Sequence, residues 1–263
     1  MEALRIQHLQ KSYDVPNRES FAALGDVTFE VRKGEFVSIV GPSGCGKTTL
    51  LTCIAGLRSR SGGQILLYGK EVTQPPREMA LIFQEYGRTL LPWKTVLDNV
   101  IFGMENRPEI KRSEHRPRGR EVLNDVGLSS FEHVYPWQLS GGQQQRVAIA
   151  RGLANGPDIL LMDEPFASVD AQTRAELEDL LLRVWQKFSR TILFVTHDID
   201  EAIYLSDRVI VLCQNPSVVL DTIAIEIERP REQISSREHP RFLHYRRYIH
   251  KLLQRSTDTG TAP

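Results

Sequence analysis

The most informative part of this chain is FVSIVGPSGCGKTTLL, Phe36 to Leu51. Val37 to Val40 form a short apolar, β-branched run that is typical of a strand buried on both faces, and Gly41 ends it. A glycine-rich loop follows, and a helical pattern begins at Thr48. The spacing G-x-x-x-x-G-K-T between a strand and a helix is that of a P-loop, and this context disfavours an ordinary glycine-rich turn. We therefore expect the chain to bind a nucleoside triphosphate.

The loop itself has the composition of an anion cradle. Its glycines have no Cβ, so the backbone can adopt left-handed angles and turn its N–H groups toward a phosphate. Lys47 adds a positive charge, and the hydroxyl of Thr48, at a helix N-terminus, is placed to ligate magnesium. The residues expected to contact the nucleotide here are Gly41, Pro42, Ser43, Gly44, Cys45, Gly46, Lys47, Thr48 and Thr49.

One cysteine lies inside this cradle. Because a helix N-terminus favours the thiolate, we expect Cys45 to be reactive, alkylation to block the turnover of a bound nucleoside triphosphate and that nucleotide to protect the thiol. The chain has three cysteines in all, without metal-type spacing, which favours a reducing compartment and no disulfide framework.

Composition sets broad limits. The 263 residues can bury a sizeable core in one or two domains, and 33 basic residues balance 33 acidic ones. This balance does not favour nucleic acid as a partner. The first ten residues lack the features of a signal peptide, and no apolar run is long enough to cross a bilayer. If the protein serves a membrane, we expect it to do so through a partner.

The first third of the chain is rich in predicted strands. They are expected at residues 4–9, 27–31, 64–68 and 79–83, with the P-loop helix as the one long helix among them. Tyr13 follows the first strand. It is either an ordinary surface aromatic residue or one whose ring stacks on the base of a nucleotide. Gln84 ends the last of these strands.

The next segment is more helical and contains an apolar loop. Leu90, Leu91 and Trp93 either cover a small core or form an exposed socket for a partner. A charged stretch, residues 105–120, is expected to be a solvated loop and the start of a helix, and a helix is predicted from about Gly119 to Val126.

Two further stretches carry chemistry. In LSGGQ, residues 139–143, Ser140 can cap the helix that follows, which creates a second anion-attracting helix N-terminus or simply a capped helix. A head-to-tail pair of chains would use both cradles. In DILLMDEP, residues 158–165, Asp163 and Glu164 end a buried strand, where one carboxylate can hold magnesium and the other can polarise water. His197 ends another buried strand and can contact a γ-phosphate.

In this order the motifs resemble those of the ABC transporter ATPase subunit. They are GPSGCGKT (41–48), Gln84, LSGGQ (139–143), ILLMDE (159–164), SVD (168–170) and His197. Three longer segments are similar to sequences of the nitrate, sulfonate and taurine importer branch: FQEYGRTLLPWKTVLDNV, YPWQLSGGQQQR and DEPFASVDAQTR.

The resemblance implies a role for each matched residue. Lys47 and the P-loop backbone would bind the phosphates, Glu164 would be the general base and His197 would steady the transition state. Magnesium would be held by Thr48, Asp163 and Gln84, and Gln84 would also sense the γ-phosphate and take part in catalysis. Tyr13 would stack on the base. The ATP of a partner chain would be contacted by Ser140, Gly142 and Gln143.

The resemblance also implies an α/β P-loop NTPase fold. Its RecA-like core, with an antiparallel β edge, would comprise residues 1–86 and 155–220, and an α-helical subdomain, 87–154, would be inserted. Val169 in place of leucine and Pro117 inside what is often a continuous helix depart from the family pattern. After Asp221 the motifs end, and residues 221–263 are expected to form a helical tail docked on the core, which is favoured over a regulatory element.

The resemblance therefore implies an ATPase that uses ATP and Mg²⁺ and works as a homodimer on the cytoplasmic face of the membrane. Its partners would be permease subunits and, through them, a substrate-binding protein, and its cargo a small anion such as nitrate, taurine or an alkanesulfonate. The alternatives are a thiamine-precursor importer and a soluble, non-transport ABC ATPase. A small-molecule kinase is disfavoured, because LSGGQ would have no task in it.

Overall fold

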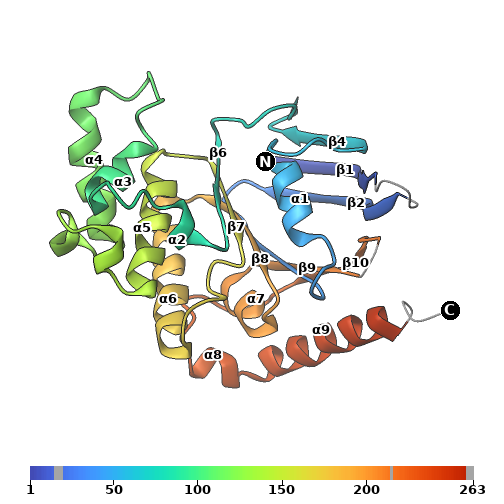
Figure 1. Ribbon diagram of the computed structural model, residues 1–263. Helices are drawn as coiled ribbons and strands as arrows, with labels where there is room; N and C mark the ends of the chain where they lie inside the picture. Colours follow the sequence, from blue (N-terminus) through green and yellow to red (C-terminus); the bar gives the residue numbers. More distant parts are fainter. Residues whose placement is uncertain (15–19, 214–215, 259–263) are drawn as a thin grey trace. The chain divides into compact units, whose positions relative to one another are not determined.

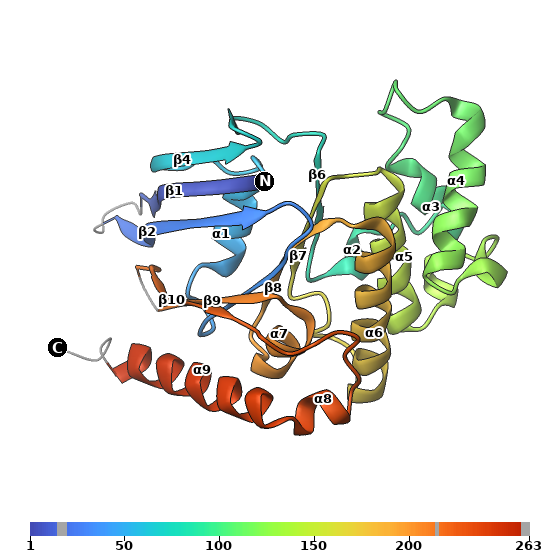
Figure 2. The ribbon, with the colours of Figure 1, turned by 180° about the vertical axis from the view of Figure 1, so that it is seen from behind.

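The computed structural model describes residues 1–14, 20–213 and 216–258 (Figures 1 and 2). The chain divides into two compact units, residues 1–76 with 191–263 and residues 77–190. The first unit contains the P-loop and the C-terminal tail. The subdomain boundaries implied by the family resemblance, 87–154, stay a prediction.

An antiparallel sheet forms one part of the first unit, in the order β2-β1-β4-β5. Its strands are β1 (Glu2–Tyr13), β2 (Phe21–Arg32), β4 (Gly62–Leu67) and β5 (Lys70–Glu71). The predicted strand at residues 4–9 is confirmed but extends at both ends, because β1 pairs with β2 on one side and β4 on the other. This backbone pairing lengthens the strand beyond its apolar run.

The second sheet segment of this unit carries the P-loop strand. Here β3 (Phe36–Val40) is parallel to β8 (Thr191–Thr196) on one side and to β9 (Arg208–Leu212) on the other. All residues of β3 and β8 are buried, as expected for parallel strands. Helix α1 (Lys47–Ile54) contacts β8, and α7 (Ile199–Leu205) contacts β3. The strand β10 (Val219–Ala224) adds an antiparallel edge to β9 and was not predicted.

The tail belongs to the first unit. After β10 come the short helix α8 (Ser235–Glu238) and the long helix α9 (Pro240–Asp258), which contacts α7 and β9. Phe242 and Ile249 on α9 are fully buried. Both ribbon views show α9, in red, running past α7.

The second unit is mainly helical. It contains one parallel pair of strands, β6 (Met79–Ile82) and β7 (Ile159–Asp163). Its other helices contact a central helix, α5 (Gly141–Ala154). The others are α2 (Tyr86–Thr89), α3 (Val96–Phe102), α4 (Arg112–Asp125) and α6 (Ala171–Phe188), with 3₁₀ turns at Ser129–Phe131 and Pro136–Gln138.

The prediction for α4 was wrong at its start. The helix begins at Arg112 and runs through Pro117, whereas the sequence pattern placed its start near Gly119. Proline removes one backbone donor, but the buried side chains His115, Val122 and Leu123 hold the helix on its neighbours. The end of the helix before Gly127 is as expected.

The apolar loop before α3 is partly core and partly surface. Leu90 is buried, and the buried Asn99 accepts a hydrogen bond from the Leu91 N–H at 2.8 Å and donates one to the Leu91 carbonyl at 3.0 Å. Trp93, in contrast, is 71% exposed. Leu90 therefore belongs to the core and Trp93 lies on the surface, while the socket for a partner stays a prediction.

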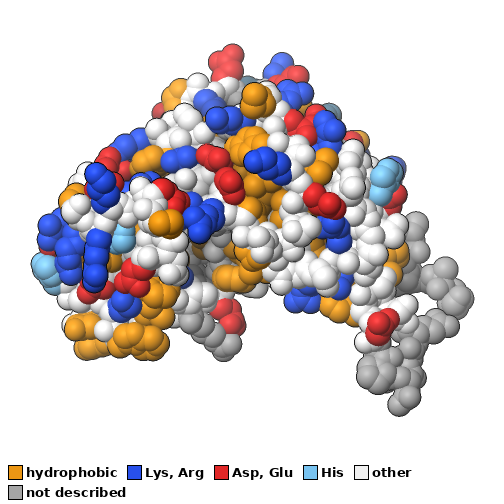
Figure 3. Space-filling view, turned by 90° about the horizontal axis from the view of Figure 1, so that it is seen from above, with side chains coloured by type: hydrophobic (Ala, Val, Ile, Leu, Met, Phe, Trp, Pro, Cys, Tyr) orange, Lys and Arg blue, Asp and Glu red, His pale blue; other side chains and the backbone are white. Residues whose placement is uncertain are grey.

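Among the described residues, no helix has the length and apolarity needed to span a bilayer. The face shown in Figure 3 carries Lys and Arg side chains interspersed with Asp and Glu, in keeping with the equal numbers of basic and acidic residues.

Candidate nucleotide-binding site

The P-loop has the predicted strand, loop and helix. After β3 the chain turns at Gly41, and the left-handed backbone of Gly44 (φ 77°) and Gly46 (φ 92°) leads into α1. A side chain at either glycine would be strained, and a Cβ on Gly46 would also lie 3.0 Å from the carbonyl oxygen of Ala23.

The backbone of this loop suits an anion. Among the described residues, we find no acceptor for the backbone N–H of Gly44 or for that of Gly46. The first N–H groups of a helix also lack partners within it, and they lie at the positive end of its dipole. These donors fit the phosphate that the sequence predicts.

Lys47 is folded back into the loop. Its ammonium group donates to the carbonyls of Gly41 at 2.9 Å and Pro42 at 3.0 Å, and the residue is only 5% exposed. A buried cation held beside the loop's N–H groups adds to the positive potential there.

The prediction of a reactive Cys45 was wrong. The side chain is fully buried, and its sulfur lies where it would be 2.7 Å from a Cβ added to Gly41. Burial raises the pKa of the Cys45 thiol, and the nearby charge of Lys47 only partly offsets that rise. The Cys45 side chain therefore packs beneath the loop and is not exposed to reagents at its surface.

Tyr13 lies next to α1. Its hydroxyl is 3.3 Å from the Thr49 hydroxyl and accepts a hydrogen bond from Arg58. The cationic groups of Lys11 and Arg58 lie 5.1 and 5.3 Å from the centre of the ring. Lys11 could have been found from the sequence, since residues two apart on a strand share a face, but Arg58 comes from beyond α1 and gave no such signal.

His197 stands at the same sheet edge as the P-loop. In the parallel register Val40 is opposite Thr196, so Gly41 and His197 each follow by one residue. The chain around this exposed histidine is well held. Thr196 donates to Glu201 at 2.6 Å, and Asp198 caps α7 by accepting from the N–H groups of Asp200 and Glu201.

The second unit brings three other predicted residues to one edge. Ile82 on β6 is opposite Met162 on β7, so Gln84 and Glu164 each follow by two residues. Asp163 is 4% exposed at the end of β7. Glu164 has a φ of 41°, which is unusual for a residue with a side chain and stores backbone strain of the kind often found at functional sites.

The LSGGQ segment caps α5 as predicted. The Ser140 hydroxyl accepts from the Gln143 N–H at 3.3 Å, and the Gln143 side-chain oxygen accepts from the Ser140 N–H at 3.0 Å. This reciprocal pair is a capping box and fixes the start of the helix.

The start of α6 packs against this turn. A Cβ added to Gly142 would lie 2.4 Å from Cγ2 of Thr173, so only glycine fits there. Thr173 donates its hydroxyl to the Asp170 carboxylate at 2.7 Å, and hydrogen bonds from Thr173 keep the pKa of Asp170 low. The sequence did not single out Thr173, because its contact with Gly142 joins residues distant in the chain.

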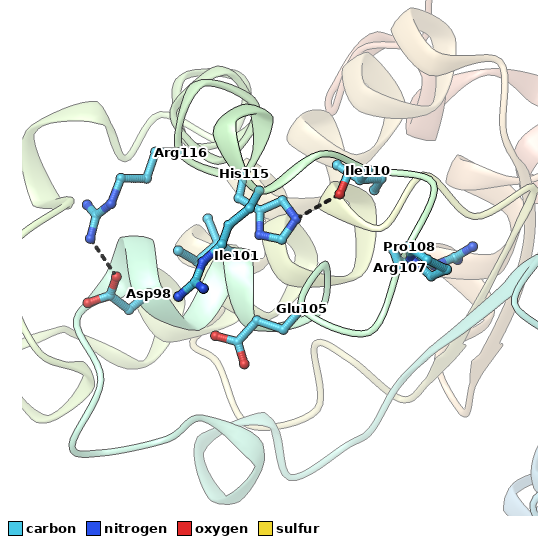
Figure 4. A pocket seen from close by; sticks show the side chains of 9 residues that line it. Asp98, Ile101, Glu105, Arg107, Pro108, Ile110, His115 and Arg116 are labelled. Carbon is cyan, nitrogen blue, oxygen red and sulfur yellow. Dashed lines mark hydrogen bonds and ion pairs between the residues drawn. The ribbon is translucent and has the colours of Figure 1, made fainter.

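A separate cleft of about 690 Å³ in the second unit lies among charged side chains of α3 and α4 (Figure 4). It contains none of the predicted site residues. Several of its polar groups already have partners: Arg116 pairs with Asp98 at 3.2 Å, His115 contacts the Ile110 carbonyl at 3.3 Å, and Glu105 pairs with Lys94 outside the cleft. We do not assign it to the nucleotide.

The predicted residues thus form two sets. The first unit brings the P-loop, Tyr13 and His197 together, and the second contains Gln84, the two carboxylates at the end of β7 and the LSGGQ turn. No cluster of three or more His, Cys, Asp or Glu side chains suited to a metal is found in the described part of the chain. The predicted magnesium ligands Thr48, Gln84 and Asp163 offer hydroxyl, amide and carboxylate oxygens, which are donors that Mg²⁺ prefers.

Comparisons with known proteins identify the family of the chain. The family model described as ABC transporter matches residues 24–167. An uncharacterized ABC transporter ATP-binding protein of Methanocaldococcus jannaschii is 49% identical and covers 95% of this chain and 91% of its own. The nitrate import ATP-binding protein NrtD of Synechococcus elongatus is 39% identical, with 94% and 93% covered. The taurine import ATP-binding protein TauB of Shigella boydii is 40% identical, with 94% and 95% covered.

A solved structure shows the same fold. The ATP-binding cassette MJ0796, in a dimeric post-hydrolysis state bound to ADP and Pi, is 32% identical and has a TM-score of 0.73. It is matched over its whole length and over 86% of this chain. The chain has the P-loop NTPase fold, belongs to the ABC transporter family and is one of its ATP-binding ATPases.

Proposed function

We propose that this ATPase powers an ABC importer for a small anion such as nitrate, taurine or an alkanesulfonate. The observation that carries the proposal is the match to NrtD and TauB, which extends over more than nine-tenths of this chain and of each relative. Two import proteins with different cargoes are equally similar to the chain, so the proposal names a class of anion rather than one compound.

The proposed site uses the residues described above. Lys47 and the loop N–H groups bind the β- and γ-phosphates, and Tyr13 stacks on the base. Glu164 accepts a proton from the attacking water, and His197 stabilises charge on the γ-phosphate in the transition state.

Thr48, Asp163 and Gln84 would hold a magnesium ion, whose oxygen ligands they match. When bound, it would neutralise phosphate charge. The backbone of Glu164, which has a positive φ, sets the direction in which its carboxylate leaves the strand.

The active form proposed is a homodimer. The dimeric state of the solved cassette supports this, and a two-fold pair would bring the LSGGQ turn of one chain to the P-loop of the other. Ser140, Gly142 and Gln143 would then contact the partner's ATP.

The proposed assembly lies on the cytoplasmic face of the cell membrane, on permease subunits that a substrate-binding protein supplies. The exposed Trp93 and the stacked pair Tyr135 and Trp137 offer aromatic side chains for contact with a permease.

Growth on single nutrients tests the cargo. A strain lacking this protein should grow normally on ammonium and sulfate, and should fail on nitrate as sole nitrogen source or on taurine or an alkanesulfonate as sole sulfur source. The wild-type gene should restore growth, and the Glu164→Gln variant, expressed at the same level, should not. Normal growth and uptake on all three compounds would refute the anion proposal.

Affinity purification tests the assembly separately. A tagged chain recovered from detergent-solubilised membranes should bring a polytopic membrane protein with it. A chain that brings none would not be a transporter subunit.

A further inference from the structure

The C-terminal tail makes hydrogen bonds to both ends of α7, the helix that begins two residues after His197. No family motif covers the tail. Three of its arginines, Arg229, Arg231 and Arg246, nevertheless donate hydrogen bonds to residues of this helix.

At the C-terminal end of α7, Arg231 is 8% exposed. Its Nη1 donates to the carbonyls of Ile203 at 2.9 Å, Tyr204 at 2.8 Å and Ser206 at 2.8 Å. The last carbonyls of a helix have no partner within it, so this guanidinium satisfies groups that burial would otherwise leave without hydrogen bonds.

Two other contacts strengthen this end. Arg229 donates to the Leu205 carbonyl at 2.7 Å, and Tyr204 donates its hydroxyl to the Arg231 carbonyl at 3.1 Å. A positive charge also suits the negative end of the helix dipole. Burial lowers the pKa of Arg231 to about 10, which leaves it charged at neutral pH.

At the N-terminal end, Arg246 of α9 binds Asp200 in the first turn of α7. Both carboxylate oxygens accept, one of them from Nε at 2.5 Å. Asp200 lies three residues after His197, and α9, whose Phe242 and Ile249 are fully buried, packs on α7 and β9.

We propose that Arg231 and Arg246 are positioning residues for hydrolysis, which hold α7 and through it His197 at the sheet edge beside the P-loop. The proposal rests on the role proposed for His197. Because β8 holds the chain before His197 and the tail holds the helix after it, loosening the tail would let His197 move without disturbing the P-loop.

Steady-state kinetics of the full-length chain with Mg-ATP tests this. Arg246→Gln should lower kcat roughly fivefold and leave KM for ATP unchanged, because His197 acts on the transition state. Arg246→Lys should recover part of the loss. Arg247→Gln is the matched control, since Arg247 is exposed on the same helix and no ion pair is found for it among the described residues; it should match the wild type.

A double variant shows whether the effect passes through His197. In the His197→Ala background, Arg246→Gln should cause no further loss of kcat. An equal loss in both backgrounds, or a change of KM alone, would overturn the proposal. Arg231→Met should lower kcat in the same way if the variant folds. The proposal is nevertheless tested by the kcat of the Arg246 variants.

These variants distinguish the proposed role of His197 from the positioning role of Arg246. If His197→Ala keeps normal kcat, the proposed role of His197 fails. If His197→Ala is impaired while Arg246→Gln behaves as the wild type, the positioning role alone is refuted.

Discussion

At Gly142 the chain has no room for a single methyl group. A Cβ there would meet Cγ2 of Thr173 at 2.4 Å, and Thr173 cannot easily turn away because its hydroxyl is held by Asp170. Gly142→Ala should therefore lower the free energy of unfolding by roughly 1–3 kcal/mol, despite the higher helix propensity of alanine. Chemical denaturation measures the change.

Thr173→Ser supplies the control for this prediction. Serine keeps the hydroxyl that binds Asp170 and removes the obstructing methyl group. In the Thr173→Ser background, Gly142→Ala should cost little or should stabilise the protein. An undiminished loss in the double variant would show that the contact with Thr173 is not the reason for the glycine.

The three cysteines should differ in reactivity. Cys45 and Cys53 are buried and burial raises the pKa of both thiols, whereas Cys213 is partly exposed. A thiol reagent at pH 7 should modify Cys213 first and the other two only after denaturation, which peptide mapping by mass spectrometry can follow. Labelling of Cys45 at the rate of Cys213 in native protein would mean that the P-loop opens readily.

At the scale of elements, the sequence predicted those helices, strands and loops whose structure is determined by residues that are neighbours in the chain. The strand, glycine loop and helix from Phe36 onward could be predicted because each step is set by neighbouring residues. The start of α4 could not, because its packing on neighbouring helices outweighs the proline in its second turn. The same holds for the inward direction of Cys45 and for the hydrogen bonds of Arg231, which depend on residues distant in sequence.

Helix α4 allows two substitutions with opposite expected effects. Pro117 is exposed and lacks the N–H of a regular helix, so Pro117→Ala should raise the free energy of unfolding by about 1–3 kcal/mol.

Gly119→Ala should instead lower it, because a Cβ there would lie 2.7 Å from Cγ2 of Ile101 and 2.8 Å from Cδ1 of Leu97 on α3. Urea denaturation of both variants gives the comparison. Stabilisation by both would mean that propensity, rather than the close approach of α3, governs this helix.

For the whole molecule, the proposed catalytic groups come from two units of one chain and, in the proposed dimer, from a second chain. The sequence indicated the groups through their order along the chain, but not the tail that holds α7. Residues 225–258 have no motif, and their contacts with α7 become visible only in the folded protein.

The dimer gives the last prediction. If Glu164 is the base for hydrolysis, Glu164→Gln should retain ATP binding and lose nearly all turnover, so ATP would hold two copies together. Analytical ultracentrifugation should show a dimer for this variant with Mg-ATP and a monomer with ADP. Adding Ser140→Arg, which places a bulky cation at the start of α5, should abolish the dimer while ATP binding to each monomer remains. A Glu164→Gln variant that stays monomeric at saturating ATP would exclude the shared site, and normal turnover by it would remove Glu164 from catalysis.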